Sequence, residues 1–164
     1  SFNHSAKINE DVLNTWCTIL KKLPSSKLII KNSFSTTQAF RQFVTAHANS
    51  FGVAPQIEFA PYAASGTDAL NLYNQIDLHF DTFPYSGTTT TCEALMMGVP
   101  TLTIADGHHR TRVSSSIMIN SGLENYCVGT VQEYVEFAVN YALGERKKLK
   151  NNIIRIAVKI VPES

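Results

Sequence analysis

The segment from Asp81 to Glu93 has the composition expected of a phosphate-binding loop. It reads DTFPYSGTTTTCE and runs from the end of an expected strand into the start of an expected helix. Gly87 permits a close approach of the backbone, and Thr88 to Thr91 supply four hydroxyls beside backbone N–H groups. A helix N-terminus carries a partial positive charge and unsatisfied N–H groups, so it suits a phosphate or a diphosphate.

Glu93 lies one turn further into this expected helix. A carboxylate there could accept hydrogen bonds from both hydroxyls of a ribose, as the acidic residue does in dinucleotide sites. The alternative is that the threonines only cap the helix, because Thr is a frequent N-cap residue. Four threonines exceed what one cap needs, which favours phosphate binding. The segment is neither a GxGxxG nor a Walker loop, so nicotinamide and P-loop chemistry lose their usual support.

Other residues with chemical potential give weaker signals. Lys7 could contact a diphosphate as a point charge, with an exposed surface lysine as the alternative. The adjacent pair His108-His109 follows Asp106, but neighbouring histidines point apart and no third ligand is suitably spaced, so we expect no metal site. Cys92 has no evident base partner, which argues against a catalytic thiol.

The elements that must position these residues alternate between helix and strand. The apolar spacing predicts helices from Asn9 or Asn14 to Pro24, around 40–47 closed by Gly52, and over 68–75, 93–97, 113–120 and 131–143. It predicts strands over 27–31, 56–60, 76–81, 100–104 and 127–128. This alternation favours an α/β Rossmann-like fold, a mainly parallel sheet flanked by helices on both faces. Ligands of such sheets bind beyond the carboxyl ends of the strands, where the Asp81–Glu93 segment is expected.

Length and composition limit the class of protein. A chain of 164 residues fits one domain. With 44% hydrophobic residues and a net charge of +1, it is neither a disordered tail nor an electrostatically driven nucleic-acid binder. No apolar run approaches the roughly 18–20 residues of a membrane span. The three cysteines are widely separated and odd in number, which favours a reducing compartment.

Taken together, these segments resemble the C-terminal catalytic lobe of the O-GlcNAc transferase/SPINDLY family of protein glycosyltransferases. The matching segments are SFNHSAKI (1–8), Trp16, LPSS (23–26), DLHFDTFPYSGTTTTCEALMMGVP (77–100), RVS (112–114) and QEY (132–134). The resemblance implies a GT-B enzyme, in which two Rossmann-like lobes face a cleft and the second lobe holds most of the nucleotide-sugar. Residues 1–164 would then be a single donor-binding lobe of a longer enzyme, without its TPR region and first catalytic lobe.

The activity implied by the resemblance is inverting transfer of a monosaccharide to Ser/Thr hydroxyls of cytoplasmic or nuclear proteins. It implies no cofactor and no bound metal, with the nucleotide-sugar as substrate. Acceptor proteins would bind through the TPR region, and neither nucleic acid nor a membrane is expected as a partner. The lobe alone is expected to bind nucleotide weakly at best and not to turn over.

The resemblance also assigns roles to matching residues. Lys7 contacts the donor diphosphate and is the catalytic candidate, and Glu93 meets the ribose. The turn from Ala60 to Ala63 matches the place where the backbone of the family meets the base. The full donor-binding set is His4, Lys7, Tyr62, Ala63, Gly87, Thr88, Thr89, Thr90, Thr91 and Glu93.

Departures from the family pattern bear on the donor. The O-GlcNAc branch has NGHTTGMD where this chain has SGTTTTCE (86–93), and it has His and Arg on the helix that follows the base-binding turn, where 68–72 has neither. The run FPYSGTTTTCE (83–93) looks instead like the SPINDLY branch, which uses GDP-fucose. We therefore favour GDP-fucose over UDP-GlcNAc. A non-catalytic nucleotide-binding or scaffold module of the same fold is the alternative function, supported by the missing His and Arg.

Overall fold

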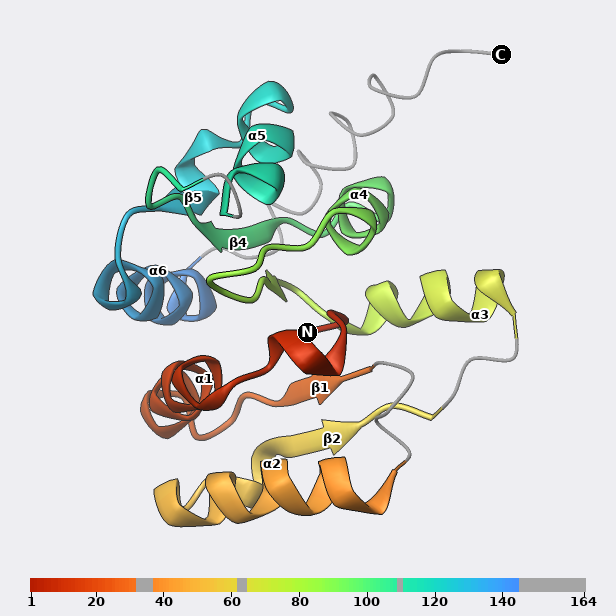
Figure 1. The fold of residues 1–164 in the computed structure, drawn as a ribbon, viewed down its shortest axis with the longest axis vertical. Coiled ribbons are helices and arrows are strands. Elements are labelled where there is room, and N and C mark those ends of the chain that lie inside the picture. Colours follow the sequence, from red (N-terminus) through yellow and green to blue (C-terminus); the bar gives the residue numbers. More distant parts are fainter. Residues whose placement is uncertain (32–36, 62–64, 109–110, 145–164) are drawn as a thin grey trace. The chain divides into compact units, whose positions relative to one another are not determined.

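The chain contains two compact units, residues 1–62 and 63–164, each of which is described by itself. The computed structural model describes residues 1–31, 37–61, 65–108 and 111–144 (Figure 1). Helices and strands alternate in both units, and the strand pairs within each unit are parallel. The predicted α/β class with parallel strands is confirmed.

The first unit is a parallel strand pair with two main helices. Strand β1 (Leu28–Ile30) pairs with β2 (Ile57–Phe59), with Leu28 opposite Ile57. Helix α1 (Glu10–Lys22) begins at Asn9, whose side chain accepts a hydrogen bond from the Val12 N–H. The predicted apolar face of α1 is confirmed as buried, because all of its members are inaccessible or nearly so: Val12, Leu13, Trp16, Ile19, Leu20 and the adjoining Leu23.

Helix α2 (Gln38–Phe51) departs from the predicted burial pattern. It ends at Gly52, as expected, in the left-handed conformation that glycine adopts readily (φ 73°). Phe43, whose spacing with Val44 helped to predict this helix, is 42% exposed, and only Val44 and Ala48 of the helix are buried.

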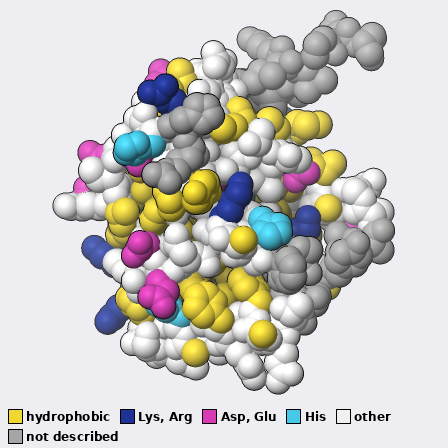
Figure 2. All heavy atoms as spheres, viewed as in Figure 1, with side chains coloured by type: hydrophobic (Ala, Val, Ile, Leu, Met, Phe, Trp, Pro, Cys, Tyr) yellow, Lys and Arg dark blue, Asp and Glu magenta, His cyan; other side chains and the backbone are white. Residues whose placement is uncertain are grey.

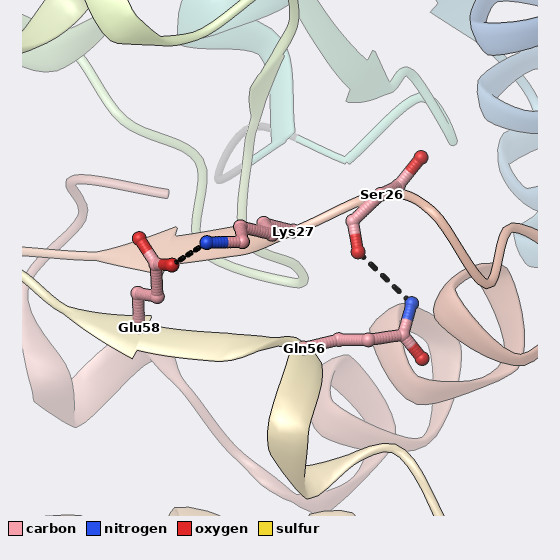
Figure 3. Close-up of polar contacts among 4 residues, drawn as sticks. All are labelled: Ser26, Lys27, Gln56 and Glu58. Atoms are coloured by element: carbon pink, nitrogen blue, oxygen red, sulfur yellow. Dashed lines mark hydrogen bonds and ion pairs between the residues drawn. The ribbon is translucent and has the colours of Figure 1, made fainter.

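A glutamine amide joins the end of α1 to the start of β2. The Gln56 side-chain N–H group faces the carbonyl oxygens of Leu20, Leu23 and Ser26 at 3.1, 2.9 and 3.0 Å. Figure 3 shows Gln56 reaching Ser26, beside an ion pair between Lys27 and Glu58 that bridges the two strands. The ion pair is exposed and so adds little to stability. The Gln56 amide, in contrast, adds hydrogen bonds to the carbonyl oxygens at the end of α1 and in the turn that follows it.

The second unit is a three-stranded parallel sheet in the order β3-β4-β5. Its strands are β3 (His79–Phe80), β4 (Thr101–Ile104) and β5 (Cys127–Val128), and its helices are α3 (Gly66–Asn71), α4 (Thr89–Met96), α5 (Arg112–Asn120) and α6 (Val131–Leu143). Every residue of β4 is buried, and Figure 1 shows α5 and α6 on opposite sides of this strand. Short 3-10 helices complete the two units at Ser5–Lys7, Ala54–Gln56, Leu72–Gln75 and Glu124–Tyr126.

Element boundaries in the second unit confirm some predictions and correct others. Helix α6 has the predicted bounds, and Thr130 with Glu133 forms a capping box at its start. Helix α4 begins at Thr89, although the sequence predicted a loop through Thr91 and a helix from Glu93. Threonine has low helix propensity, and contacts from elsewhere in the unit hold this turn. The helix predicted over 68–75 is α3 continued by a 3-10 turn, and the strand predicted over 76–81 is shorter.

The described residues include no membrane-spanning helix, and on the face in view their basic side chains do not gather in a patch. None of the helices in the described ranges is long and apolar enough to cross a bilayer. On the face drawn in Figure 2, the Lys and Arg side chains that the structure describes lie scattered. The C-terminal segment from residue 145, which contains Arg146, Lys147, Lys148 and Lys150, lies outside the described residues.

Candidate functional site

The N-terminus of α4 is open toward solvent. Thr88 occupies the N-cap position, but its side chain makes no capping hydrogen bond within the part of the chain that the structure describes. The side chains of Thr88 and Thr89 are exposed, and Thr90 is half-buried. A cap would have pointed the Thr88 hydroxyl back at the first-turn N–H groups. The threonine run therefore does not serve simply as a helix cap, and the first turn keeps its partial positive charge.

Both backbone polar groups of Gly87 form hydrogen bonds within the protein. Its N–H donates to Asp81 Oδ1 at 2.8 Å, and its carbonyl oxygen accepts from Ser114 Oγ at 2.7 Å. The Gly87 N–H is thus directed into the unit, so it is not presented to a ligand. Thr91 also faces inward, because its buried hydroxyl lies 2.8 Å from Ser114 Oγ. Of the predicted phosphate-binding residues, Thr88 to Thr90 form the accessible part, while Gly87 and Thr91 anchor it.

Asp81 is the buried acid beneath this segment. Its side chain is 1% exposed, and its second oxygen, Oδ2, accepts from Thr103 Oγ1 at 2.8 Å. Burial raises the pKa of the Asp81 carboxyl, and hydrogen bonds from Gly87, Thr103 and neighbouring groups oppose that rise. Sequence reasoning placed Asp81 at the start of the segment but gave it no role. An acid at a strand end, six residues before a glycine, was the available signal.

Glu93 is oriented by a buried tyrosine. The Tyr73 hydroxyl lies 3.1 Å from Glu93 Oε2 and 3.1 Å from the carbonyl oxygen of Thr90. Tyr73 is fully buried, and its burial, followed by the charge of Glu93, raises the pKa of its hydroxyl, which therefore stays protonated and donates. Sequence reasoning did not select Tyr73, since nothing in its neighbourhood distinguishes a site residue from a core aromatic.

The candidate residues of the first unit lie on its N-terminal turn. His4 caps the 3-10 helix Ser5–Lys7, because its Nδ1 accepts from the Ala6 N–H at 3.2 Å. The proton of the neutral ring therefore lies on Nε2. His4 also lines an open hollow of about 420 Å³ together with apolar side chains that include Phe40 and Phe43. Lys7 is half-buried at the end of the same turn.

Some residues considered in the sequence analysis lie outside the described residues, and others lie apart from any group of possible metal ligands. Tyr62, Ala63 and His109 fall in ranges that the structure does not describe. His108 binds Asp106 through its backbone N–H at 3.0 Å, as part of a local turn. In the described ranges, no three His, Cys, Asp or Glu side chains come together in a way that could hold a metal ion. Cys92 is an exposed free thiol.

Comparison with known proteins covers nearly the entire chain. The profile of glycosyl transferase family 41 matches residues 1–161. A mutant of Thermobaculum terrenum O-GlcNAc transferase superposes with a TM-score of 0.91 and 31% sequence identity, covering 97% of this chain and 31% of that one. The arrangement of helices and parallel strands is therefore that of a part of this enzyme, which agrees with the predicted Rossmann-like lobe.

Curated relatives come from plants. The "Probable UDP-N-acetylglucosamine--peptide N-acetylglucosaminyltransferase SPINDLY" of Solanum lycopersicum is 39% identical over 143 residues, which are 87% of this chain and 15% of the relative. The protein of the same type named SEC in Arabidopsis thaliana is 33% identical over 149 residues, 89% of this chain and 15% of the relative. The chain thus spans about 15% of the length of these curated relatives.

Proposed function

Because the chain belongs to glycosyl transferase family 41, we propose that it is the donor-binding lobe of a nucleotide-sugar-dependent protein O-glycosyltransferase. The observation that carries this proposal is the start of α4. Thr88 and Thr89 are exposed, and Thr88 gives the helix no side-chain cap. Glu93 lies one turn further along α4, and its carboxylate accepts a hydrogen bond from the Tyr73 hydroxyl. A diphosphate on the first turn and a ribose against the carboxylate suit this arrangement.

The phosphate contacts come from the accessible part of the α4 start. Thr88, Thr89 and Thr90 offer hydroxyls and first-turn N–H groups, and the helix dipole favours negative charge there. Gly87 and Thr91 support this turn from below and do not donate to the ligand with their buried groups. The proposed site therefore uses fewer direct donors than the run of threonines suggests.

Catalysis in this proposal is electrostatic. A Ser or Thr hydroxyl of the acceptor attacks the anomeric carbon of the sugar with inversion and releases its proton to solvent. The bond from sugar to phosphate breaks, and the nucleoside diphosphate leaves with the electron pair of that bond and added negative charge. The family resemblance assigns Lys7 to that diphosphate, and the α4 N-terminus by itself suits a phosphate. Both are positive where charge develops, which is the usual main source of stabilisation in a transition state. In this proposal the reaction uses neither a metal nor a cofactor.

The donor sugar is the finer part of the proposal. The run from Phe83 to Glu93 supports GDP-fucose, because it resembles the SPINDLY branch. The printed names of the SPINDLY and SEC relatives specify UDP-N-acetylglucosamine, which makes UDP-GlcNAc the second candidate. Acceptors are Ser/Thr-containing intracellular proteins.

Calorimetric titration of the chain with GDP and with UDP tests this proposal. We expect the chain to bind GDP more tightly than UDP. The affinity for GDP should be at least about tenfold lower in Glu93→Gln, because a neutral amide accepts hydrogen bonds from ribose hydroxyls less strongly than a carboxylate does. Glu124→Gln is the matched control, since Glu124 is an exposed acid of the same unit. Preferential binding of UDP would assign UDP-GlcNAc as the donor.

Lys7→Ala provides the second arm of the same titration. We expect weaker binding of the diphosphate and unchanged binding of the corresponding nucleoside, which lacks phosphates. Lys22→Ala is the control, because Lys22 is an exposed lysine of the same unit. Failure of both nucleotides to bind the unsubstituted chain would contradict its role as the donor-holding lobe, and equal losses in Lys7→Ala and Lys22→Ala would remove the role of Lys7.

A further inference from the structure

A buried serine of α5 contacts the phosphate-binding segment at more than one point. Ser114 Oγ donates to the Gly87 carbonyl oxygen at 2.7 Å, and the Ser114 N–H lies 3.4 Å from Ser86 Oγ. The same Oγ lies 2.8 Å from the hydroxyl of Thr91 in α4. Ser114 is fully buried, so these contacts are shielded from water. A single side chain thus joins the loop, α4 and α5.

The Asp81 carboxylate accepts a hydrogen bond from the N–H of the same residue, Gly87. The Ser114 hydroxyl donates to the Gly87 carbonyl oxygen. Both backbone polar groups of Gly87 are therefore fixed. Thr103 of β4 holds the other oxygen of Asp81. Polar side chains buried in this way cost desolvation energy unless their hydrogen bonds are made. Apolar residues could fill the same volume as Asp81, Thr103 and Ser114. Polar side chains at these positions therefore indicate that the orientation of the Gly87 peptide matters.

We propose that Ser114, acting with Asp81, is a positioning residue that fixes the Gly87 peptide and so presents the α4 N-terminus to the donor diphosphate. This inference rests on the proposed function, because it assigns a purpose to the α4 start that only a bound diphosphate would use. Ser114 does not touch the ligand. Its hydroxyl sets the direction of the peptide that leads into Thr88, and N–H groups contribute to anion binding only when they are already aimed at the anion.

The chain itself offers a matched control. Ser115, the next residue of α5, is also a buried serine, but its hydroxyl bonds to the carbonyl oxygens of Thr111 and Arg112 in its own helix. Ser115→Ala therefore removes the same atom from the same helix without touching the loop. Thr103→Val is a second variant on the Asp81 side of Gly87, because it preserves shape while releasing Oδ2 of Asp81.

The experiment is titration of the full chain and these variants with GDP, UDP and the two nucleosides guanosine and uridine. We expect Ser114→Ala to bind the preferred diphosphate about tenfold more weakly, the effect of losing roughly one buried hydrogen bond. Binding of the nucleoside should change less than twofold, because the base and ribose contacts remain. A merely structural serine would weaken both ligands equally, so the ratio of the two affinities is the decisive readout.

The outcomes separate this inference from the function on which it rests. Absence of diphosphate binding in the unsubstituted chain overturns the proposed function and the inference with it. Diphosphate binding that Ser114→Ala leaves unchanged, or that Ser115→Ala weakens as much, overturns the inference alone. If circular dichroism shows that Ser114→Ala does not fold, Thr103→Val decides: selective loss of diphosphate affinity supports the positioning role, and unchanged affinity refutes it.

Discussion

Replacing Tyr73 with phenylalanine removes one hydroxyl from the interior of the second unit and nothing else. That hydroxyl faces Glu93 Oε2 and the Thr90 carbonyl oxygen, each at 3.1 Å. Hydrogen bonds to charged groups contribute about 1.5–3 kcal/mol, against about 0.5–1.5 kcal/mol for neutral pairs. Since the ring stays and no large cavity forms, we expect Tyr73→Phe to lower the free energy of unfolding by about 2 kcal/mol.

A second tyrosine provides the comparison. The Tyr141 hydroxyl donates to the carbonyl oxygen of Asp77 at 3.0 Å, and this side chain is also buried. Its acceptor is neutral, so Tyr141→Phe should cost only about 1 kcal/mol. Urea denaturation followed by circular dichroism measures both. In thermal scans, the expected decrease in melting temperature is about 4–8 °C for Tyr73→Phe and about 2–4 °C for Tyr141→Phe.

A double-mutant cycle identifies the partner. We expect Tyr73→Phe and Glu93→Gln to be coupled by about 1 kcal/mol, because each single change removes the same charge-assisted hydrogen bond. Coupling below about 0.3 kcal/mol, the limit within which independent sites add, would refute the reasoning that Tyr73 orients Glu93. Tyr73→Phe should also reduce the preference of the chain for GDP over its 2′,3′-dideoxy analogue, since a loosened carboxylate grips the ribose hydroxyls less well.

Further predictions concern single residues of both units. His79 is fully buried, and burial holds its pKa well below the usual range. Below about pH 6.5 the unfolded chain takes up a proton that the folded chain does not, so the free energy of unfolding should fall between pH 6.5 and 5.5 by up to about 1.4 kcal/mol. Urea midpoints measured at the two pH values should show a smaller fall in His79→Gln. Gly52→Ala should cost about 1 kcal/mol from strain at φ 73° alone, because nothing lies within 4 Å of an added methyl group; an unchanged urea midpoint would contradict this. Thr130→Ala should cost about 1 kcal/mol through loss of the α6 cap, and Thr130→Ser should restore most of it in the same assay.

Local sequence signals predicted the helices whose ends depend on adjacent residues. Asn9, one of two starts that the sequence left open, caps α1, and Gly52 ends α2 as predicted. The predicted helix over 131–143 is α6, and its cap Thr130 is added by the structure. The start of α4 was missed, because four threonines have low helix propensity and no local cap marks the turn. The turn is held instead by Ser114 and Tyr73, which lie 23 and 17 residues away in the chain from their α4 partners.

By itself, the sequence determined the family, the α/β alternation with parallel strands, and the segment on which a donor phosphate is expected. These depend on residue order and local periodicity, which a linear reading contains. Only the tertiary structure decided which groups of that segment face outward and which are anchored inside. Gly87 and Thr91 turned inward because Asp81 and Ser114 meet them there. A buried polar group must be satisfied by whatever partner packing brings near, and apolar periodicity shows that a residue is buried without naming that partner.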